Sequence, residues 1–405
     1  MEDWLSILKT HAAGVSCIMN SDYSYPIPRS RGMRKFLLFQ FSFSLALIAL
    51  IGLTQPAQAS SEAQADDLAE RGKYIATIAG CASCHTPDKA EFQNPQAMNF
   101  EQIQTIAFDA HLALDNDRLL AGGRAFDLGP AGMVFSRNIT PDEETGIGAW
   151  TDEQIKLAIK TGVSADGSLL FPVMPYHVYN GMADADLDAV VAYLRSVPAV
   201  RNEVPQRTVS VEGLAALPYQ EGISAPGADN PSARGAYLVN HVMGCTDCHT
   251  PIDPNTGAPQ MDKYLAGRQP YEGPWGIVYG GNITPDKETG IGEWNDAEIK
   301  QALLSGTARD GRRLILMPWY AYAALTTEDA DAVVHFLKND LAPVSNAIPA
   351  ASLNEGFMVT APPQTPSEAG SLDLNSPYAL AAAGVLVIAL VTLGMFLLRR
   401  GAKNG

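Results

Sequence analysis

The chain has 405 residues, 46% of them hydrophobic, and a formal net charge of −16. This length is enough for two ordinary domains, each with its own core. The acidic charge argues against nucleic acid and anionic lipid as partners. The five cysteines are odd in number and unevenly spaced, which argues against a disulfide framework and leaves metal, redox or cofactor chemistry open.

The N-terminus is typical of an export signal. Met33 is followed by two basic residues, a mostly apolar run over 36–53 and the small-x-small sequence AQA at 57–59. We expect Met33 to be the true start. The extended N-terminus and signal peptide, 1–59, would then be removed together with Cys17. An uncleaved membrane anchor is the alternative.

The central part of the chain repeats itself. NITPDEETGIGAWTDEQIKLAIKTG at 138–162 matches NITPDKETGIGEWNDAEIKQALLSG at 282–306. The shorter elements RG-x-Y, LAGG, GPAG and MPY of the first copy recur, with small changes, in the same order in the second. We expect two homologous domains, at 60–205 and 229–345, joined by a linker at 206–228.

The first domain contains about 20 extra residues within roughly 90–117, because the interval from His85 to Asn138 exceeds that from His249 to Asn282. Their apolar periodicity predicts one extra surface helix. An insertion confined to one domain is a reasonable docking site for a partner.

Helical signals dominate the two copies. Amphipathic segments begin with N-cap residues and end at glycine, and no alternating run is long enough to suggest a large sheet. The expected fold class is therefore all-α. The expected helices cover 66–80, 152–161, 185–196, 295–305 and 327–339.

The C-terminal part has the features of a membrane anchor. A Pro-rich tether over 346–378 precedes the uncharged apolar run Ala379–Leu398, whose 20 residues match the thickness of a bilayer core. Basic residues follow at once, which predicts one transmembrane helix with a cytoplasmic C-terminus. The domains would then face the periplasm from the bacterial inner membrane. A buried core helix is the alternative.

Four of the five cysteines lie in two C-x-x-C-H motifs. A zinc site would need further ligands, typically two such pairs in one small domain, and a thioredoxin-like redox pair would need a βαβ context. Haem attachment explains every position, because the thiols become thioethers to the haem vinyl groups and the histidine ligates the iron. We expect two covalently attached haem c groups. The motifs are Cys81, Cys84 and His85, and Cys245, Cys248 and His249.

A haem iron held by one histidine has a sixth position, and a methionine there raises the reduction potential. Met174 and Met317 occupy the same place in the two copies, after an apolar run and before a proline. Core packing is the alternative use of such methionines. His177 competes as sixth ligand in the first domain, but Tyr320 stands at the matching position, so a shared mechanism favours methionine.

Other repeated residues have a structural and a functional interpretation. The NITPD turns and the tryptophans after them either contact the haem propionates or simply form an N-capping turn. Gly72 and Gly235 are expected to let the first helix of each domain approach its last helix, with Tyr74 and Tyr237 packing at the same crossing. The candidate propionate contacts are Asn138, Thr140, Trp150, Asn282, Thr284 and Trp294.

The motifs C-x-x-C-H-T, LAGG, NITPD…TGIGxW, MPY and the final AYL or HFL helix resemble those of class I-type multihaem cytochromes c. More closely, the chain resembles the cytochrome c subunits of membrane-bound bacterial alcohol, gluconate and aldehyde dehydrogenases, over roughly 66–200 and 230–343. The resemblance implies two tandem class I cytochrome c-like domains that take electrons from a catalytic partner and pass them to quinone or an oxidase. Those subunits usually carry three haem domains, whereas here the tether and apolar run follow the second.

The sequence thus predicts a membrane-anchored periplasmic dihaem cytochrome c that relays single electrons. A dehydrogenase catalytic subunit is the expected donor, and a quinone- or oxidase-linked component of the respiratory chain is the expected acceptor. No nucleophile or carboxylate pair is visible, so the chain is not expected to be an enzyme on its own. A dihaem peroxidase, which needs an open sixth site, and a haem-based sensor are the alternatives.

Overall fold

The computed structural model describes residues 56–94, 97–354 and 357. The chain divides into two units, Met1–Gln64 and Ala65–Gly405, and the account below concerns the second. The predicted signal up to residue 55, most of the predicted tether and the apolar run Ala379–Leu398 lie outside the described residues.

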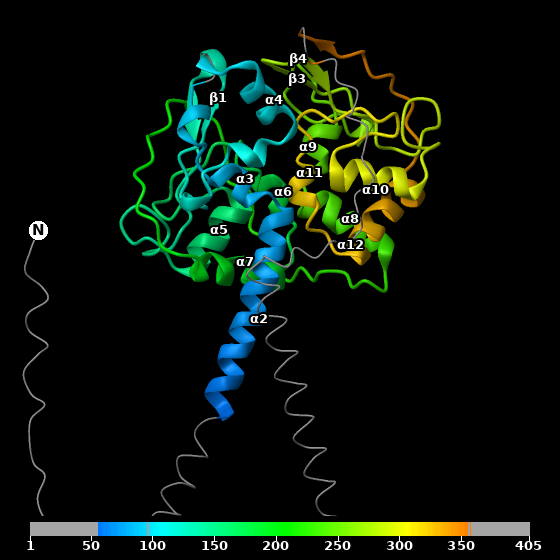
Figure 1. Cartoon of the computed structure of the whole chain (residues 1–405). Helices are drawn as coiled ribbons and strands as arrows, with labels where there is room; N and C mark the ends of the chain where they lie inside the picture. The colour runs from blue at the N-terminus through cyan, green and yellow to red at the C-terminus, as the bar shows by residue number, and fades with distance from the viewer. Residues whose placement is uncertain (1–55, 95–96, 355–356, 358–405) are drawn as a thin grey trace, which may run out of the picture. The chain divides into compact units, whose positions relative to one another are not determined.

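The two sequence copies, called here the first and the second repeat, show the same order of helices (Figure 1). In Figure 1, α3, α5, α6 and α7 of the first repeat lie to the left of α8 to α12 of the second. The helices of the first repeat are α2 Pro56–Ile78, α3 Cys81–His85, α5 Asp152–Thr161, α6 Tyr176–Tyr179 and α7 Asp184–Ser196. Those of the second are α8 Pro231–His241, α9 Cys245–His249, α10 Asp296–Ser305, α11 Trp319–Tyr322 and α12 Thr327–His335, continued by the π-helical turn η7 Phe336–Asp340.

Local sequence determines where the matching helices α5 and α10 begin and end. Thr151 and Gln154 form a reciprocal capping box at the start of α5, and Asn295 and Glu298 form the same arrangement at the start of α10. Both helices end at a glycine in the left-handed region, with φ of 77° and 63°. The α5 boundaries agree with the expected 152–161.

The extra residues of the first repeat contain the expected helix, α4 Phe100–Phe108. It begins with a capping box between Asn99 and Gln102. Short 3₁₀ turns complete this segment and the matching loops: η1 Ala90–Phe92, η3 Ala110–Ala113, η4 Asn116–Arg118, η5 Gly129–Ala131 and η6 Met261–Lys263.

The expectation of an all-α fold is wrong, because each repeat also contains a small antiparallel sheet. β1 Ala125–Asp127 pairs with β2 Met133–Phe135, with Phe126 opposite Val134. In the second repeat β3 Pro270–Gly273 pairs with β4 Gly276–Tyr279, which also pairs with β5 Ser352–Leu353. These strands are two to four residues long. They are at or below the shortest length, about four residues, at which alternating hydrophobicity predicts a strand.

The predicted membrane topology also needs correction. In the part of the chain that the structure describes, no helix combines the length and the apolar character needed to cross a bilayer. The predicted single transmembrane helix and inner-membrane localisation therefore have no support in the fold.

The hydrophobic core is continuous through both repeats. Within each repeat the first helix crosses the last at a glycine, as expected. A Cβ on Gly72 would lie 1.8 Å from the Ala189 carbonyl oxygen of α7, and one on Gly235 would lie 2.1 Å from the Ala332 oxygen of α12. Only glycine permits this approach of the two backbones.

Tyr74 and Tyr237, which were expected to pack at these crossings, also connect the two repeats, because the hydroxyl of each bonds to a residue of the other repeat. The hydroxyl of Tyr74 donates to Asp329 Oδ2 at 2.5 Å, and the hydroxyl of Tyr237 donates to Asp186 Oδ2 at 2.7 Å. Asp186 also pairs with Arg71. Asp329 accepts two hydrogen bonds of 2.7 Å from Arg234. Each repeat thus supplies a carboxylate to its own arginine and to the other repeat's tyrosine.

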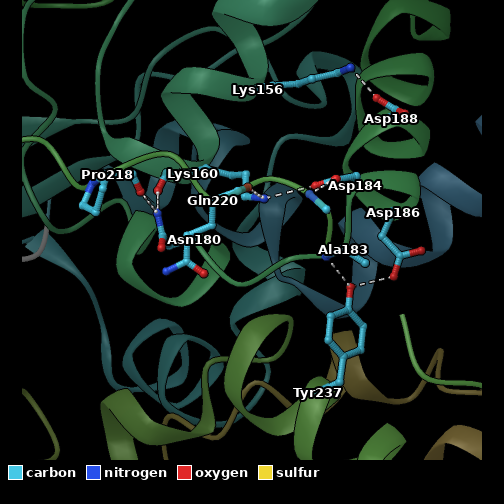
Figure 2. Close-up of polar contacts among 11 residues, drawn as sticks. Lys156, Lys160, Asn180, Ala183, Asp184, Asp186, Asp188, Pro218, Gln220 and Tyr237 are labelled. Carbon is cyan, nitrogen blue, oxygen red and sulfur yellow. Dashed lines mark hydrogen bonds and ion pairs between the residues drawn. The ribbon is translucent and has the colours of Figure 1, made fainter. Parts of the chain in front are cut away.

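Figure 2 shows the contact between Tyr237 and Asp186, together with part of the segment that connects the repeats. Tyr237 points at Asp186 and accepts from the backbone N–H of Ala183 at 3.1 Å. Nearby, the fully buried ammonium of Lys160 donates to the Gln220 carbonyl at 2.5 Å. The predicted linker is therefore held against the first repeat rather than being a free tether.

Candidate functional site

The histidines of the two C-x-x-C-H motifs are oriented by the backbone. Nδ1 of His85 lies 2.7 Å from the Arg137 carbonyl oxygen, and Nδ1 of His249 lies 2.7 Å from that of Gly281. A carbonyl only accepts, so Nδ1 carries the hydrogen and the neutral ring leaves a lone pair on Nε2. Burial lowers the pKa of both imidazoles, which favours this neutral form. Such an imidazole, fixed through one nitrogen, is a ready metal ligand through the other.

The threonine after each histidine and the repeated LAG turn hold these short helices in place. The carbonyl of His85 accepts from Gly122 N at 2.6 Å, and Thr86 Oγ1 accepts from Leu120 N at 3.2 Å. The second repeat has the same two bonds, from Gly267 N to His249 O at 2.6 Å and from Leu265 N to Thr250 Oγ1 at 3.1 Å. This explains why C-x-x-C-H-T and LAG recur together.

The leucine of each LAG turn adopts an unusual backbone conformation. Leu120 and Leu265 have φ of 63° and 58°, a region that costs a non-glycine residue about 1–2 kcal/mol. Both side chains are almost fully buried, at 1% and 0% exposure. Burial of a leucine is worth roughly 1.5–3 kcal/mol, so it offsets the backbone cost.

The four motif cysteines are unpaired thiols. Burial, with a smaller contribution from the neighbouring cysteine, raises the pKa of Cys81 and of Cys245 to about 12. Burial also raises the pKa of Cys84 and Cys248. Catalytic redox cysteines need the opposite shift. Among the described residues, no group of three or more His, Cys, Asp or Glu side chains is placed to share a metal ion. The zinc and redox alternatives therefore lack what they require in this part of the chain.

The two motifs and the two candidate methionines line one cavity of about 2400 Å³. A typical small-molecule pocket measures roughly 300–1,000 Å³, so this cavity has room for more than one ordinary ligand. The predicted residues in its wall are Cys81, Cys84, His85, Asn138, Trp150, Met174, Cys245, Cys248, His249, Asn282, Trp294 and Met317. Thr140 and Thr284 lie behind the wall and are fully or almost fully buried.

A second tyrosine pair connects the methionine segments to the cysteine motifs. The hydroxyl of Tyr179 donates to the Ala79 carbonyl at 2.7 Å, two residues before Cys81. The hydroxyl of Tyr322 donates to the Met243 carbonyl at 2.9 Å, two residues before Cys245. Each tyrosine follows its candidate methionine by five positions, so this bond links the methionine segment to the residues just before the cysteine motif. Sequence reasoning missed this pair, although its matched spacing was visible in both copies.

The asparagines of the two NITPD turns, Asn138 and Asn282, form hydrogen bonds with other residues of the protein. Nδ2 of Asn138 donates to Thr145 Oγ1 at 3.0 Å and to the Val200 carbonyl at 2.8 Å, while Oδ1 accepts from Thr140 N and Oγ1. Asn282 makes the same bonds to Thr289, Val344 and Thr284. These bonds tie each turn to the residues after the last helix. A propionate contact by these side chains stays a prediction, as it does for Trp150 and Trp294 in the cavity wall.

The side chain of His177, the competing sixth ligand, contacts the second repeat. Its Nε2 lies 2.9 Å from Oδ1 of Asp247, which stands between the two cysteines of the second motif. In the matching position Tyr320 lies beside Ser83, between the cysteines of the first motif. The residue three positions after each candidate methionine thus contacts the other repeat's C-x-x-C-H helix. This use of Nε2 leaves Met174 as the better-placed candidate in the first repeat.

The paired thiols, the neutral histidines with a free Nε2 and the methionines in the same cavity wall form a donor set that fits covalently attached haem. Two thiols provide the atoms for thioether bonds, and imidazole nitrogen and thioether sulfur are the usual axial donors of electron-carrying haem. The same set is present once in each repeat.

Comparison with known proteins agrees with this chemistry. Residues 69–198 match the family described as cytochrome c. The chain is 30% identical to the fructose dehydrogenase cytochrome subunit of Gluconobacter japonicus, over 71% of this chain and 54% of that protein. It is 28% identical to the gluconate 2-dehydrogenase cytochrome c subunit of Pantoea cypripedii, over 73% of this chain and 64% of that subunit. A diheme cytochrome c-type protein of Cereibacter sphaeroides is 29% identical, over 66% of this chain and 85% of its own length. The chain therefore spans about half to two thirds of the two dehydrogenase subunits.

Proposed function

We propose that this chain, which carries a cytochrome c domain and is homologous to cytochrome c subunits of dehydrogenases, holds two haem c groups and relays single electrons. The observation that carries the proposal is the repeated donor set. Each repeat has a thiol pair, a histidine fixed through Nδ1 and a methionine, all in the wall of one cavity.

In the first repeat Cys81 and Cys84 would form the two thioether bonds, with His85 and Met174 as axial ligands. In the second repeat Cys245 and Cys248 would form these bonds, with His249 and Met317 as axial ligands. When bound, a haem iron supplies reversible one-electron chemistry.

The protein's own residues orient the ligands. The Arg137 and Gly281 carbonyls fix the imidazole planes through Nδ1, and such outer partners also raise the basicity of the ligating nitrogen. The hydrogen bonds from Tyr179 to Ala79 and from Tyr322 to Met243 hold the segment that follows each methionine next to the residues that precede each cysteine motif. A buried iron with thioether ligation favours a high potential and a closed sixth position, which suits a carrier.

Two repeats facing one cavity support a relay rather than a pair of independent carriers. The contacts His177–Asp247 and Tyr320–Ser83 join each methionine segment to the other repeat's cysteine motif. We infer a dehydrogenase catalytic subunit as electron donor, because two of the related proteins are named as the cytochrome subunits of dehydrogenases. A quinone- or oxidase-linked component of the respiratory chain is the proposed acceptor.

The test is to purify the protein from a host that matures c-type cytochromes and to count haem per chain by the pyridine haemochrome spectrum and intact mass. The expected result is two haems, and one in the Cys245→Ala/Cys248→Ala variant. Rapid single-electron reduction by a co-purifying dehydrogenase, with no peroxide turnover, would support the relay. A single haem, or peroxidase activity with an open sixth site, would overturn it.

A further inference from the structure

The extra segment of the first repeat packs on the second repeat. We call residues Phe100–His111, comprising α4 and the start of η3, the strap. Ala107 and Phe108 at the end of α4 are buried in a separate cluster with Trp275 of the second repeat. Val278 and Ile315 pack against this cluster. The strap therefore covers part of the second repeat.

The strap contacts the loop that carries Met317. The Ala107 carbonyl accepts from Leu316 N at 2.8 Å, and the Phe108 carbonyl accepts from Trp319 Nε1 at 2.9 Å. These bonds hold the residue directly before Met317 and the residue two positions after it. Both sides of the candidate ligand are thus tied to one turn of the strap.

Side chains reinforce this attachment at Arg313. Its guanidinium donates to Asp109 Oδ1 at 2.6 Å and lies 4.7 Å from the centre of the Phe108 ring. About a quarter of each charged side chain is exposed, 26% for Arg313 and 24% for Asp109, so the pair is partly shielded from water. The ring of His111 stacks on Tyr320 with 4.8 Å between ring centres.

The backbone held in this way is strained. Leu316 has a φ of 62°, a region that a leucine rarely adopts. The loop from Gly306 to Met317 is one residue shorter than the matching loop from Gly162 to Met174. The shorter loop needs the left-handed residue to bring its methionine to the same place. No residue from Val163 to Pro175 other than glycine has a positive φ.

We propose that the strap is the positioning element for Met317: it holds the strained loop in the conformation that presents this sulfur to the second haem. The inference rests on the proposed function, because it takes Met317 as an axial ligand. On the Met174 side the second repeat contacts His177 through Asp247, but among the described residues no hydrogen bond ties the residues on both sides of Met174 to the second repeat. The Leu169 carbonyl of the Met174 loop instead accepts from Arg207 of the linker at 2.8 Å. The two haems would therefore differ in how readily the sixth ligand leaves the iron.

The experiment compares Asp109→Ala and Phe108→Ala with the wild-type holoprotein. Glu101→Gln is the matched control, because Glu101 is exposed in the first turn of the same helix. The first readout is hydrogen exchange of the Leu316 amide, followed by mass spectrometry of the peptide that contains it. The second is the binding rate of imidazole to the ferric haems, which requires that the methionine leave the iron. Asp109→Glu, which keeps the carboxylate, serves as the rescue variant.

Loss of a hydrogen bond to a charged group corresponds to about a tenfold change in the opening equilibrium. We expect the Leu316 amide to exchange about tenfold faster in Asp109→Ala, and one of the two imidazole-binding phases to accelerate by a similar factor. The other phase serves as an internal control and should not change. Glu101→Gln should match the wild type, and Asp109→Glu should recover part of the effect.

Unchanged imidazole binding in both strap variants would overturn the proposal, whether or not the amide exchanges faster. Equal acceleration of both phases would also overturn it, because it would indicate general loosening of the fold. Met317→Ala addresses the underlying ligand assignment separately. If this variant kept the full sulfur-to-iron charge-transfer absorption, the second site of the proposed function would be refuted, and the role of the strap with it.

Discussion

Replacing Asp329 tests whether the contacts between the repeats stabilise the fold. This carboxylate is 5% exposed and accepts hydrogen bonds from Arg234 of its own repeat and from Tyr74 of the other. Removing one partner of a buried ion pair costs about 3–5 kcal/mol, because the remaining charge stays buried without compensation. We expect Asp329→Ala to lose about 4 kcal/mol of unfolding free energy. Tyr74→Phe, which leaves the ion pair intact, should lose about 1.5 kcal/mol.

Asp331→Ala is the matched control. It removes a carboxylate two residues away on α12 that pairs with Lys300 but is 56% exposed, and such pairs contribute about 0–1 kcal/mol. Urea unfolding followed by circular dichroism would give both free energies. If Asp329→Ala and Asp331→Ala differed by less than about 1 kcal/mol, the reasoning from burial would be refuted.

The same carboxylate predicts a pH dependence. Burial acts to raise the pKa of Asp329, but the hydrogen bonds from Arg234 and Tyr74 outweigh it and hold this pKa below its usual range. A depressed pKa contributes stability above the unfolded-state value of about 4, and this contribution is lost as pH falls through the folded-state value. The stability difference between wild type and Asp329→Ala should therefore shrink below about pH 4.

Three further predictions concern the site. Met317→Ala should remove the sulfur-to-iron absorption of one haem. It should also lower the reduction potential of that haem by a sizeable part of the roughly 0.8 V range that axial ligands span. Redox titration measures this potential, and Met261→Leu, at an exposed methionine, is the control. Asn138→Ala should cost about 1–3 kcal/mol in urea unfolding, because buried partners lose their bonds, while haem content stays at wild-type level. A loss of haem would instead indicate a direct role in binding. The hydrogen bond to Asp247 raises the pKa of His177, so its contribution is present below about pH 6.5 and fades as pH rises through the folded-state value. His177→Gln should thus weaken the fold more at pH 5.5 than at pH 9, and a constant difference would contradict this ion pair.

Features encoded by local sequence were predictable. The capping box at Thr151 and the terminal Gly162 define α5 through contacts within a few residues, and periodicity found the helix of the insertion. The C-x-x-C-H motifs indicated the donor set because covalent chemistry needs that spacing. The short strands escaped prediction, because β1 and β2 have only three residues each and show no usable alternation.

Contacts between the repeats could not be predicted in the same way. A duplicated sequence contains two copies of each bonding partner, here the tyrosines Tyr74 and Tyr237 and the carboxylates of Asp186 and Asp329. From the sequence alone, each tyrosine could equally bond to the carboxylate of its own repeat or to that of the other. The pattern placed Tyr74 at the crossing of its own helices, whereas the structure sends its hydroxyl to the other repeat. The strap shows the same limit, since the periodicity of 100–108 predicts a helix but not the surface on which it lies.

The exchange of Tyr74 and Tyr237 between the repeats has the form of an isologous interface, in which one patch meets its own equivalent, as in a homodimer with two-fold symmetry. Here the two equivalent patches belong to one chain. A single chain keeps the partners at a fixed stoichiometry and frees each half to diverge. The strap and the exchange of His177 for Tyr320 are differences of this kind, and they make the two proposed haem sites distinguishable. Either repeat produced alone would expose half of this interface, so we expect it to associate with itself in solution.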